Sequence, residues 1–455
     1  MKYFFETYGC QMNLAESAAL SLTAKERGWE EAESSSDADL VLINTCSVRA
    51  TAEQRVMGRL AHYSAVKKKM AVQKKTPLAL VVAGCMAERL GGKLKENGAD
   101  FLMGTSSRSS FPMILEAVEQ GVNGPVSPGG NYSAKPGDEK PEFSFSAFHL
   151  DEKNPFRSFV PIMHGCNNFC SYCIVPYVRG REISRSPDAI LEEIRLAGAS
   201  GVREITLLGQ NVNSYLWEGG PSARLDFSGL LELIARNLDA GKVQWVRFLA
   251  SHPKDLSDES IRVLAENPCF CRHIHLPVQH GSNRILSAMN RRYTREQYLD
   301  LVKRLRQAMP DLSLSTDILV GFPGETEEDL EAALSLMEEV KFLYAYMYHY
   351  NPREGTAAYG LPDRIDTDVK KDRLSRVIAL QKQHTSKLLK SRIGREVTVL
   401  IEGISRKNAD ELVSRTERDE MVVFPGSEAA IGSFARLTLS SIKGNTFRSG
   451  AFDVL

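Results

Sequence analysis

The sequence lacks any apolar run long enough to cross a bilayer. A membrane-spanning helix needs about 20 consecutive apolar residues, and no such run occurs in this chain. The first ten residues, MKYFFETYGC, also lack the basic and then apolar order of a secretion signal. We therefore expect a cytoplasmic protein with no membrane partner.

The sequence also has no net charge. Lys and Arg together number 57, and so do Asp and Glu. A balanced chain has no global positive field that would draw it to nucleic acid, so any such binding must use local patches. With 43% apolar and 25% charged residues, the composition is that of an ordinary folded protein, and a length of 455 residues suggests about three domains.

No internal repeat stands out, and cysteine is sparse, with eight residues in the chain. In a cytoplasmic protein, spaced cysteines more often serve metals or catalysis than disulfides. Three of them end the apolar, β-prone runs YFFETYGC, LVLINTC and LALVVAGC, at Cys10, Cys46 and Cys85. Runs that alternate with helical stretches predict a parallel sheet covered by helices over residues 1–123. The carboxyl ends of such strands share one edge, so we expect the three thiols to converge there.

The rest of the chain divides by composition. Residues 124–155 are rich in Gly, Pro and Ser and predict a linker. Residues 156–391 alternate six strand-like runs with helical segments, which predicts a partial (β/α)6 barrel whose working face is the carboxyl end of its strands. Residues 392–455 change to short alternating runs, typical of a small antiparallel β-barrel. The expected fold class is α/β with a small β domain at the end.

The stretch HGCNNFCSYC, residues 164–173, places three cysteines on one short loop after the first barrel strand. Zinc is one alternative, because His164 could complete a set of four ligands. Zinc ligands usually come in two pairs from separated turns, however, whereas Cys166, Cys170 and Cys173 lie together. The sequence therefore favours an iron–sulfur cluster, in which three thiolates leave one iron without a protein ligand.

The order C-x3-C-x-aromatic-C, with Tyr172 as the aromatic residue, resembles the radical S-adenosylmethionine enzymes. The resemblance implies that S-adenosylmethionine chelates the open iron of a [4Fe–4S] cluster and is cleaved to a 5′-deoxyadenosyl radical. It also implies a fold in which the cofactor lies at the carboxyl end of the barrel. Further cofactor contacts implied by similar motifs are Gln210 in LLGQN, Gln279 in LPVQHGS, and Gly321, Pro323 and Gly324 in GFPGET.

A radical core flanked by a three-cysteine α/β domain and a small β-barrel resembles the methylthiotransferases, whose terminal barrel is called TRAM. The resemblance implies that Cys10, Cys46 and Cys85 hold an auxiliary [4Fe–4S] cluster, also with an open iron, and that all six cysteines are catalytic. The stretches GQNVNSY, CIVPYVRGRE and HLPVQHGSNRILSAMNRRYTREQY are most similar to the MiaB branch, which modifies carbon 2 of N6-isopentenyladenosine beside the tRNA anticodon. One departure is His280, where the family often has Ser.

The resemblance implies several partners: the tRNA anticodon loop, an external reductant and a donor of sulfur or of an iron–sulfur cluster. Candidate RNA contacts are Arg179, Arg181, Arg291, Arg292 and the lysine-rich run 66–75. The alternative for all of them is an ordinary surface position that contacts only solvent. Cys269 and Cys271 are expected to be structural.

Other functions stay open. A methylthiotransferase could instead act on a threonylcarbamoyl-type adenosine in tRNA or on an aspartate of a ribosomal protein. A module that uses two clusters only for binding or electron transfer is a different class. Release of 5′-deoxyadenosine would separate an enzyme from that module, because an electron carrier has no reason to cleave S-adenosylmethionine.

Overall fold

The computed structural model describes residues 1–47, 50–72, 78–121, 154–220, 223–238 and 242–455. The chain divides into two compact units. The first comprises Met1–His149, Phe159–Asn167 and Ile174–Arg185, and the second comprises Leu150–Ser158, Asn168–Cys173 and Ser186–Leu455. Most of the expected linker 124–155 lies outside the described residues. Within the described part of the chain, no helix is long and apolar enough to cross a membrane.

The first unit is built on a parallel sheet with the strand order β2-β1-β3-β4-β5. Its strands are β1 (Lys2–Tyr8), β2 (Glu30–Glu31), β3 (Leu40–Thr45), β4 (Ala79–Gly84) and β5 (Phe101–Met103). Every residue of β3 and β4 is buried, as expected for central strands that are covered on both faces. The predicted parallel sheet is therefore confirmed.

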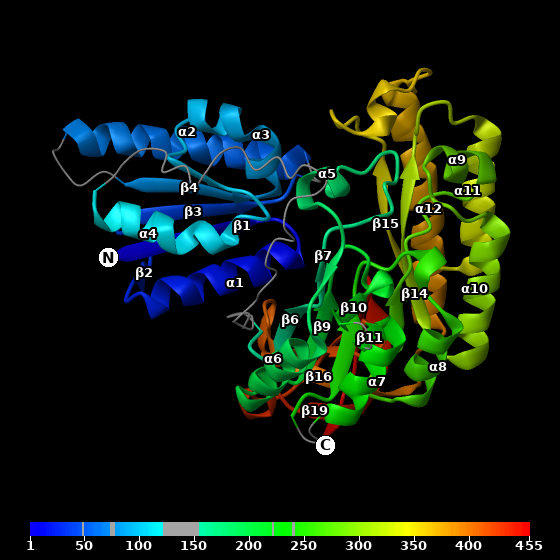
Figure 1. Ribbon diagram of the computed structural model, residues 1–455. Coiled ribbons are helices and arrows are strands. Elements are labelled where there is room, and N and C mark those ends of the chain that lie inside the picture. The colour runs from blue at the N-terminus through cyan, green and yellow to red at the C-terminus, as the bar shows by residue number, and fades with distance from the viewer. Residues whose placement is uncertain (48–49, 73–77, 122–153, 221–222, 239–241) are drawn as a thin grey trace. The chain divides into compact units, whose positions relative to one another are not determined.

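Helices cover both faces of this sheet (Figure 1). They are α1 (Gln11–Glu26), α2 (Ala50–Val72), α3 (Cys85–Glu96) and α4 (Phe111–Glu119). Side chains of α1 and α4 form one apolar core with one face, and side chains of α2 and α3 form a second core with the other. Two layers of helix thus hold the central strand ends in fixed register.

Two later pieces of chain also belong to the first unit. They carry the end of β6 (Arg157–Pro161), β7 (Met163–His164), α5 (Val175–Arg179) and β8 (Ile183–Ser184). β7 and β8 pair antiparallel. Among these elements, α5 packs against α3 of the amino-terminal domain, which the sequence did not indicate.

The second unit contains most of the barrel. Its parallel strands are β9 (Glu204–Leu208), β12 (Trp245–Phe248), β13 (His273–His275), β14 (Ser313–Val320) and β15 (Tyr344–His349). Between them run α6 (Pro187–Ala199), α7 (Phe227–Asn237), α8 (Asp258–Glu266), α9 (Asn283–Ala288), α10 (Arg295–Ala308), α11 (Glu327–Val340) and finally α12 (Thr367–Lys390). The predicted partial barrel is confirmed. The hairpin of β10 (Leu216–Gly220) and β11 (Ala223–Asp226) is an addition that the sequence analysis missed.

A seven-stranded sheet forms the end of the chain, in the order β20-β21-β18-β17-β16-β19-β22. The strands are β16 (Glu396–Ser405), β17 (Asn408–Thr416), β18 (Met421–Pro425), β19 (Phe434–Thr438), β20 (Ser441–Lys443), β21 (Thr446–Arg448) and β22 (Phe452–Val454). All neighbours are antiparallel except β18 and β21. This agrees with the predicted small β domain.

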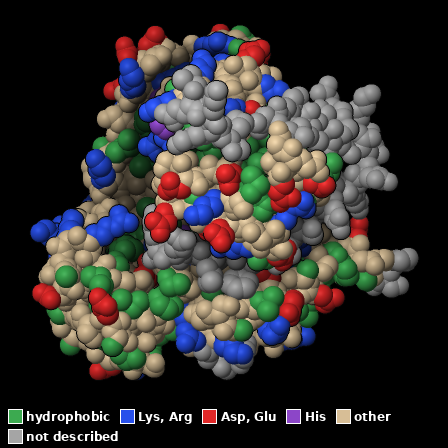
Figure 2. Space-filling view, turned by 90° about the vertical axis from the view of Figure 1, so that its left-hand side faces the viewer, with side chains coloured by type: hydrophobic (Ala, Val, Ile, Leu, Met, Phe, Trp, Pro, Cys, Tyr) green, Lys and Arg blue, Asp and Glu red, His purple; other side chains and the backbone are tan. Residues whose placement is uncertain are grey.

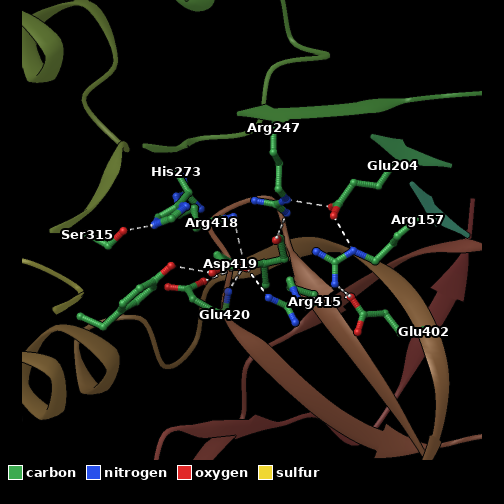
Figure 3. A network of polar contacts seen from close by, with 12 residues as sticks. Arg157, Glu204, Arg247, His273, Ser315, Glu402, Arg415, Arg418, Asp419 and Glu420 are labelled. Atoms are coloured by element: carbon green, nitrogen blue, oxygen red, sulfur yellow. Dashed lines mark hydrogen bonds and ion pairs between the residues drawn. The ribbon is translucent and has the colours of Figure 1, made fainter. Parts of the chain in front are cut away.

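A buried polar network joins this β domain to the amino ends of the barrel strands (Figure 3). Glu204 accepts hydrogen bonds from Arg157 at 2.7 Å and from Arg247 at 2.8 Å. Arg247 also donates to the carbonyl oxygens of Thr416 and Glu417, at 2.8 and 2.9 Å, in the turn after β17. Since Glu204 and Arg247 at its centre are buried, this network fixes the β domain to the base of the barrel.

Candidate functional site

The three amino-terminal thiols follow the carboxyl ends of adjacent strands. Cys10 follows β1 after one residue, Cys46 follows β3 directly, and Cys85 follows β4 directly. Cys46 lies within hydrogen-bonding reach of both Cys10 and Cys85. The structure thus brings the three side chains together, as the topology of a parallel sheet requires.

Two of these thiols stand at helix amino termini. Cys10 caps α1, and Cys85 is the first residue of α3. Hydrogen bonding with Cys46 is the largest influence that lowers the pKa of Cys10 to about 6 and that of Cys85 to about 7, against the effect of burial. The same bonds raise the pKa of Cys46. Hydrogen bonding thus favours the thiolate form of the outer thiols, which is the form that binds metal.

Two buried asparagines fix the positions of the thiols. Asn13 Oδ1 accepts a hydrogen bond from the Cys10 amide at 3.1 Å, and Asn13 Nδ2 donates to Asn44 Oδ1 at 3.0 Å. Gly84, with φ +91°, precedes Cys85, and a Cβ there would lie 2.6 Å from the Thr45 carbonyl oxygen. The sequence analysis missed these residues; a polar Asn44 inside the apolar run LVLINTC was the available signal.

An arginine from the later chain reaches the same region of the first unit. Arg179, the last residue of α5, is 4% exposed, and its Nη1 donates to Glu16 Oε1 at 2.9 Å. Arg108 Nη1 lies 3.4 Å from the same oxygen. Electrostatic attraction to Arg179 adds to the hydrogen bonds that lower the pKa of Cys10 and of Cys85.

The second thiol loop passes through both units. Cys166 belongs to the first, where its amide donates to the Gly180 carbonyl oxygen at 3.1 Å, and Cys170 and Cys173 belong to the second. A turn joins the latter two, because the Cys173 amide donates to the Cys170 carbonyl oxygen at 2.9 Å. Their common role as ligands of one cluster stays a prediction from spacing.

A segment after α9 holds the second part of this loop. Ser171 donates from its amide to the Met289 carbonyl oxygen at 3.0 Å and from Oγ to the Ala288 carbonyl oxygen at 2.8 Å. Asn290 Nδ2 donates to the Phe169 carbonyl oxygen at 2.9 Å. The stretch that resembled the family in sequence therefore serves here as a backbone anchor.

Arg291 contacts a thiol directly. Its Nη1 donates to Cys170 Sγ at 3.3 Å, and its Nη2 donates to the Pro277 carbonyl oxygen at 2.7 Å. Tyr293 Oη, which accepts from Arg291 Nε at 3.1 Å, donates in turn to the Val278 carbonyl oxygen at 2.7 Å. A guanidinium held by three partners has a fixed direction, so its bond to sulfur is pre-organised.

The structure contradicts two of the proposed RNA contacts. Arg179 and Arg291 are each 4% exposed and bonded to carboxylate or sulfur, so neither can reach a nucleic acid. Arg181 and Arg292 are exposed and stay candidates. In the run 66–75, Lys67 pairs with Asp100, and residues 73–75 lie outside the described chain.

The remaining cofactor candidates of the second unit lie at one end of its strands. Gln210 follows β9, Gln279 follows β13, and the glycine turn that contains Gly321, Pro323 and Gly324 follows β14. Gly321 has φ +70°, and a Cβ there would lie 2.4 Å from Lys370 Cγ. The candidates thus share the carboxyl face of the barrel, opposite the β domain.

Tyr172 packs into an apolar cluster at this face. The cluster includes Ile285, Met289, Leu319 and Phe322. The ring therefore ties the thiol loop to the glycine turn, which is a packing role beside the cofactor contact that the family resemblance implies.

His280, the departure from the family pattern, is a buried structural residue. It is 0% exposed, and its Nδ1 accepts a hydrogen bond from the Ser282 amide at 3.1 Å. Its Nε2 lies 3.4 Å from Glu325 Oε2 in the glycine turn. Although burial alone would raise the pKa of Glu325, His280 and Arg373 hold that pKa below its usual value. His280 therefore links two loops of the barrel mouth.

Cys271 is buried against Trp245 and the apolar residues Leu400 and Phe434 of the β domain. Burial raises its pKa and that of Cys269. Both stay in the thiol form near neutral pH, as expected of structural cysteines.

The donor set of the amino-terminal triad fits an iron–sulfur cluster. Among the described residues, no three His, Cys, Asp or Glu side chains are arranged to hold a single metal ion. A four-iron cluster places each thiolate on a different iron, so its ligands need not converge on one point. Three adjacent thiols, two of which have lowered pKa values, are compatible with such a group.

The electrostatics of the surface agree with the balanced composition. On the face drawn in Figure 2, Lys and Arg side chains are interspersed with Asp and Glu. No single-sign patch dominates that view.

Family models match three parts of the chain. Residues 2–104 match the uncharacterized protein family UPF0004, residues 160–337 match the radical SAM superfamily, and residues 390–449 match the TRAM domain. Among solved structures, the fold is similar to the radical S-adenosylmethionine methyltransferase TsrM from Kitasatospora setae. That likeness has a TM-score of 0.57 and 15% identity, and it covers 79% of this chain and 74% of the other.

Curated relatives match over almost the whole length. The chain is 48% identical to the tRNA-2-methylthio-N(6)-dimethylallyladenosine synthase of Treponema denticola, with 99% of both chains covered. It is 42% identical to the synthase of the same name from Bacteroides thetaiotaomicron, with 98% of this chain and 95% of the other covered. The expected resemblance is confirmed, and it displaces the zinc alternative. The chain belongs to the tRNA-2-methylthio-N(6)-dimethylallyladenosine synthase family, whose members are radical S-adenosylmethionine methylthiotransferases that use [4Fe–4S] clusters.

Proposed function

We propose that this protein transfers a methylthio group to carbon 2 of N6-dimethylallyladenosine, also called N6-isopentenyladenosine, in the anticodon loop of tRNA. The observation that carries the proposal is full-length identity of 42 to 48% to synthases of this one name. Threonylcarbamoyladenosine and a ribosomal-protein aspartate lack such support, and a simple electron carrier would not need the radical core. The reaction takes place in the cytoplasm, where tRNA is modified.

Six cysteines would hold the cofactors. Cys10, Cys46 and Cys85 would bind the auxiliary [4Fe–4S] cluster, and Cys166, Cys170 and Cys173 would bind the cluster that receives S-adenosylmethionine. When bound, these groups supply an electron, a carbon-centred radical and a place for sulfur, which the substitution of an unactivated aromatic C–H requires. An external reductant and a donor of sulfur or of an iron–sulfur cluster would serve them.

The protein's own residues do the positioning. Asn13 and Asn44 hold the amino-terminal thiols in place, and Arg291 directs a hydrogen bond at Cys170. Gln210, Gln279 and the turn 321–324 would bind S-adenosylmethionine at the carboxyl face of the barrel, with Tyr172 packed beneath the turn. Because the β domain lies at the opposite end of the barrel, it would hold tRNA at a distance from the target base.

Nucleoside analysis tests this function. A strain without the protein should lose the 2-methylthio group from N6-dimethylallyladenosine, as measured by mass spectrometry of digested tRNA, and keep the dimethylallyl group. Re-expression of the protein should restore the modification. Unchanged 2-methylthio content in the deletion strain, with loss of methylthio-threonylcarbamoyladenosine instead, would favour the second substrate.

A further inference from the structure

Helix α5 packs against one of the amino-terminal thiols. Ile174 and Val178 form an apolar cluster with Cys85, and Thr105 Oγ1 donates to the Val178 carbonyl oxygen at 2.6 Å. In Figure 1, α5 lies beside α3, the helix that begins at Cys85. The chain that follows the second thiol loop in sequence thus forms part of the wall around the first thiol site.

The end of α5 brings a buried positive charge to that wall. Arg179 is 4% exposed and Glu16 is 2% exposed. The bonds from Arg179 Nη1 and Nη2 to Glu16 measure 2.9 and 3.5 Å, so the guanidinium cannot swing into solvent without breaking them. Its direction is set by an acid on α1, the helix that Cys10 caps.

Two cations meet one acid in this region. Arg179 and Arg108 both pair with Glu16. Burying a cation costs several kcal/mol unless negative charge lies close by. Three thiolates with a four-iron cluster carry roughly one net negative charge in the oxidised state, which is the sign of charge that a buried arginine attracts.

We propose that Arg179 is a positioning residue for the auxiliary cluster: Glu16 holds its guanidinium at the end of α5, the helix that packs against Cys85, where it balances the charge of the cluster bound by Cys10, Cys46 and Cys85. The inference rests on the proposed function, because it takes these thiols as cluster ligands. Its consequence is that the auxiliary site depends on α5, whose first residue stands two positions after Cys173 in the sequence. A cation near a cluster favours the more negative, reduced state and so raises the reduction potential.

The test uses the full-length chain with only the auxiliary cluster. Cys166→Ala, Cys170→Ala and Cys173→Ala together remove the other ligand set and give the parent protein. Arg179→Met, Arg179→Lys and, as a matched control from the same segment, Arg181→Met are then added singly. After anaerobic reconstitution, each protein is assayed for iron and sulfide content, for the electron paramagnetic resonance spectrum of the reduced cluster, and for its midpoint potential.

We expect Arg179→Met to shift the reduction equilibrium about tenfold against the reduced cluster, which for one electron is a fall of about 59 mV. Arg179→Lys should shift it less, and Arg181→Met, at an exposed position, should not shift it. If Arg179→Met fails to retain iron, the proposal requires Arg179→Lys to restore both iron and potential. The role of Arg179 would be overturned if Arg179→Met and the parent had equal iron content, potential and spectrum. Equal loss of iron in Arg179→Met and Arg179→Lys would overturn it as well. Absence of any cluster from the parent would instead refute the ligand assignment in the proposed function.

Discussion

Arg291 Nη1 donates a hydrogen bond to Cys170 Sγ at 3.3 Å, inside the second unit and almost fully out of solvent. The cation comes from the segment that follows α9, whereas the sulfur lies on the loop after the first barrel strand. Hydrogen bonds to the thiolate sulfurs of an iron–sulfur cluster stabilise its reduced state and raise its potential. With Cys170 as a cluster ligand, as proposed above, Arg291 would influence the energetics of S-adenosylmethionine cleavage from a position far away in sequence.

Replacement of Arg291 by Met should lower the midpoint potential of the radical cluster. The measurement is a redox titration in a chain where Cys10, Cys46 and Cys85 are Ala, so that one cluster remains. Loss of one charge-assisted bond to sulfur should weaken the reduced state by about 1.5 to 3 kcal/mol. Arg292→Met is the control, because Arg292 is the exposed neighbour. An unchanged potential in Arg291→Met with full iron content would contradict the prediction.

The two thiol sets should fail in different ways. Cys166→Ala should abolish release of 5′-deoxyadenosine, because the electron needed for cleavage comes from that cluster. Cys46→Ala should keep some cleavage and lose sulfur insertion. Chromatography of the small products and mass analysis of tRNA from the same reaction would check both. Full methylthio product from Cys46→Ala would show that the amino-terminal thiols are not required.

Breaking the network at the barrel base should destabilise the second unit strongly. Glu204 is 1% exposed and binds two guanidinium groups, so Glu204→Gln leaves buried cations without their partner and should cost about 3 to 5 kcal/mol of unfolding free energy. Glu192→Gln is the matched control, because Glu192 bonds to Arg195 at an exposed site. Urea unfolding would measure both, and equal midpoints would argue against the network.

Removal of the β domain should harm the barrel itself. Truncation after residue 391 exposes Trp245 and Cys271 and removes the carbonyl oxygens that accept from Arg247. We therefore expect the truncated chain to unfold at a lower temperature and to aggregate. Weaker tRNA binding by the truncated chain would then not by itself demonstrate that the β domain binds RNA. Surface substitutions in the β domain, measured by tRNA affinity at constant melting temperature, provide the cleaner test.

Acid should weaken the second unit through His273. Burial lowers the pKa of His273 to about 3, whereas an unfolded His has a pKa of about 6.5. The unfolded state binds the extra proton between these values, so this residue's contribution is fully present above pH 6.5 and is lost as pH falls, by at most about 1.4 kcal/mol per pH unit. Lowering the pH from about 7.5 to about 5.0 should reduce the unfolding free energy of the unmodified protein by about 2 kcal/mol more than that of His273→Gln. The same difference in both proteins would argue against a neutral buried His273.

The sequence alone was sufficient for the fold class and the convergence of the first thiols. The runs that end at Cys10, Cys46 and Cys85 alternate with helices, and helical crossovers between successive strands give a parallel arrangement in which those ends meet. The Cys166 loop could equally be identified from the sequence, because its three cysteines are close together in the chain. Local spacing and strand periodicity carry this information without any knowledge of packing.

The tertiary structure decided which polar residues became internal. Arg179 and Arg291 looked like surface cations, since nothing adjacent in sequence neutralises either charge; their partners, Glu16 and Cys170, are 163 and 121 residues away. His280 likewise paired with Glu325 across two loops. A charged side chain can be buried only where packing supplies a partner, and that partner is set by the meeting of distant segments, which short-range sequence patterns do not encode.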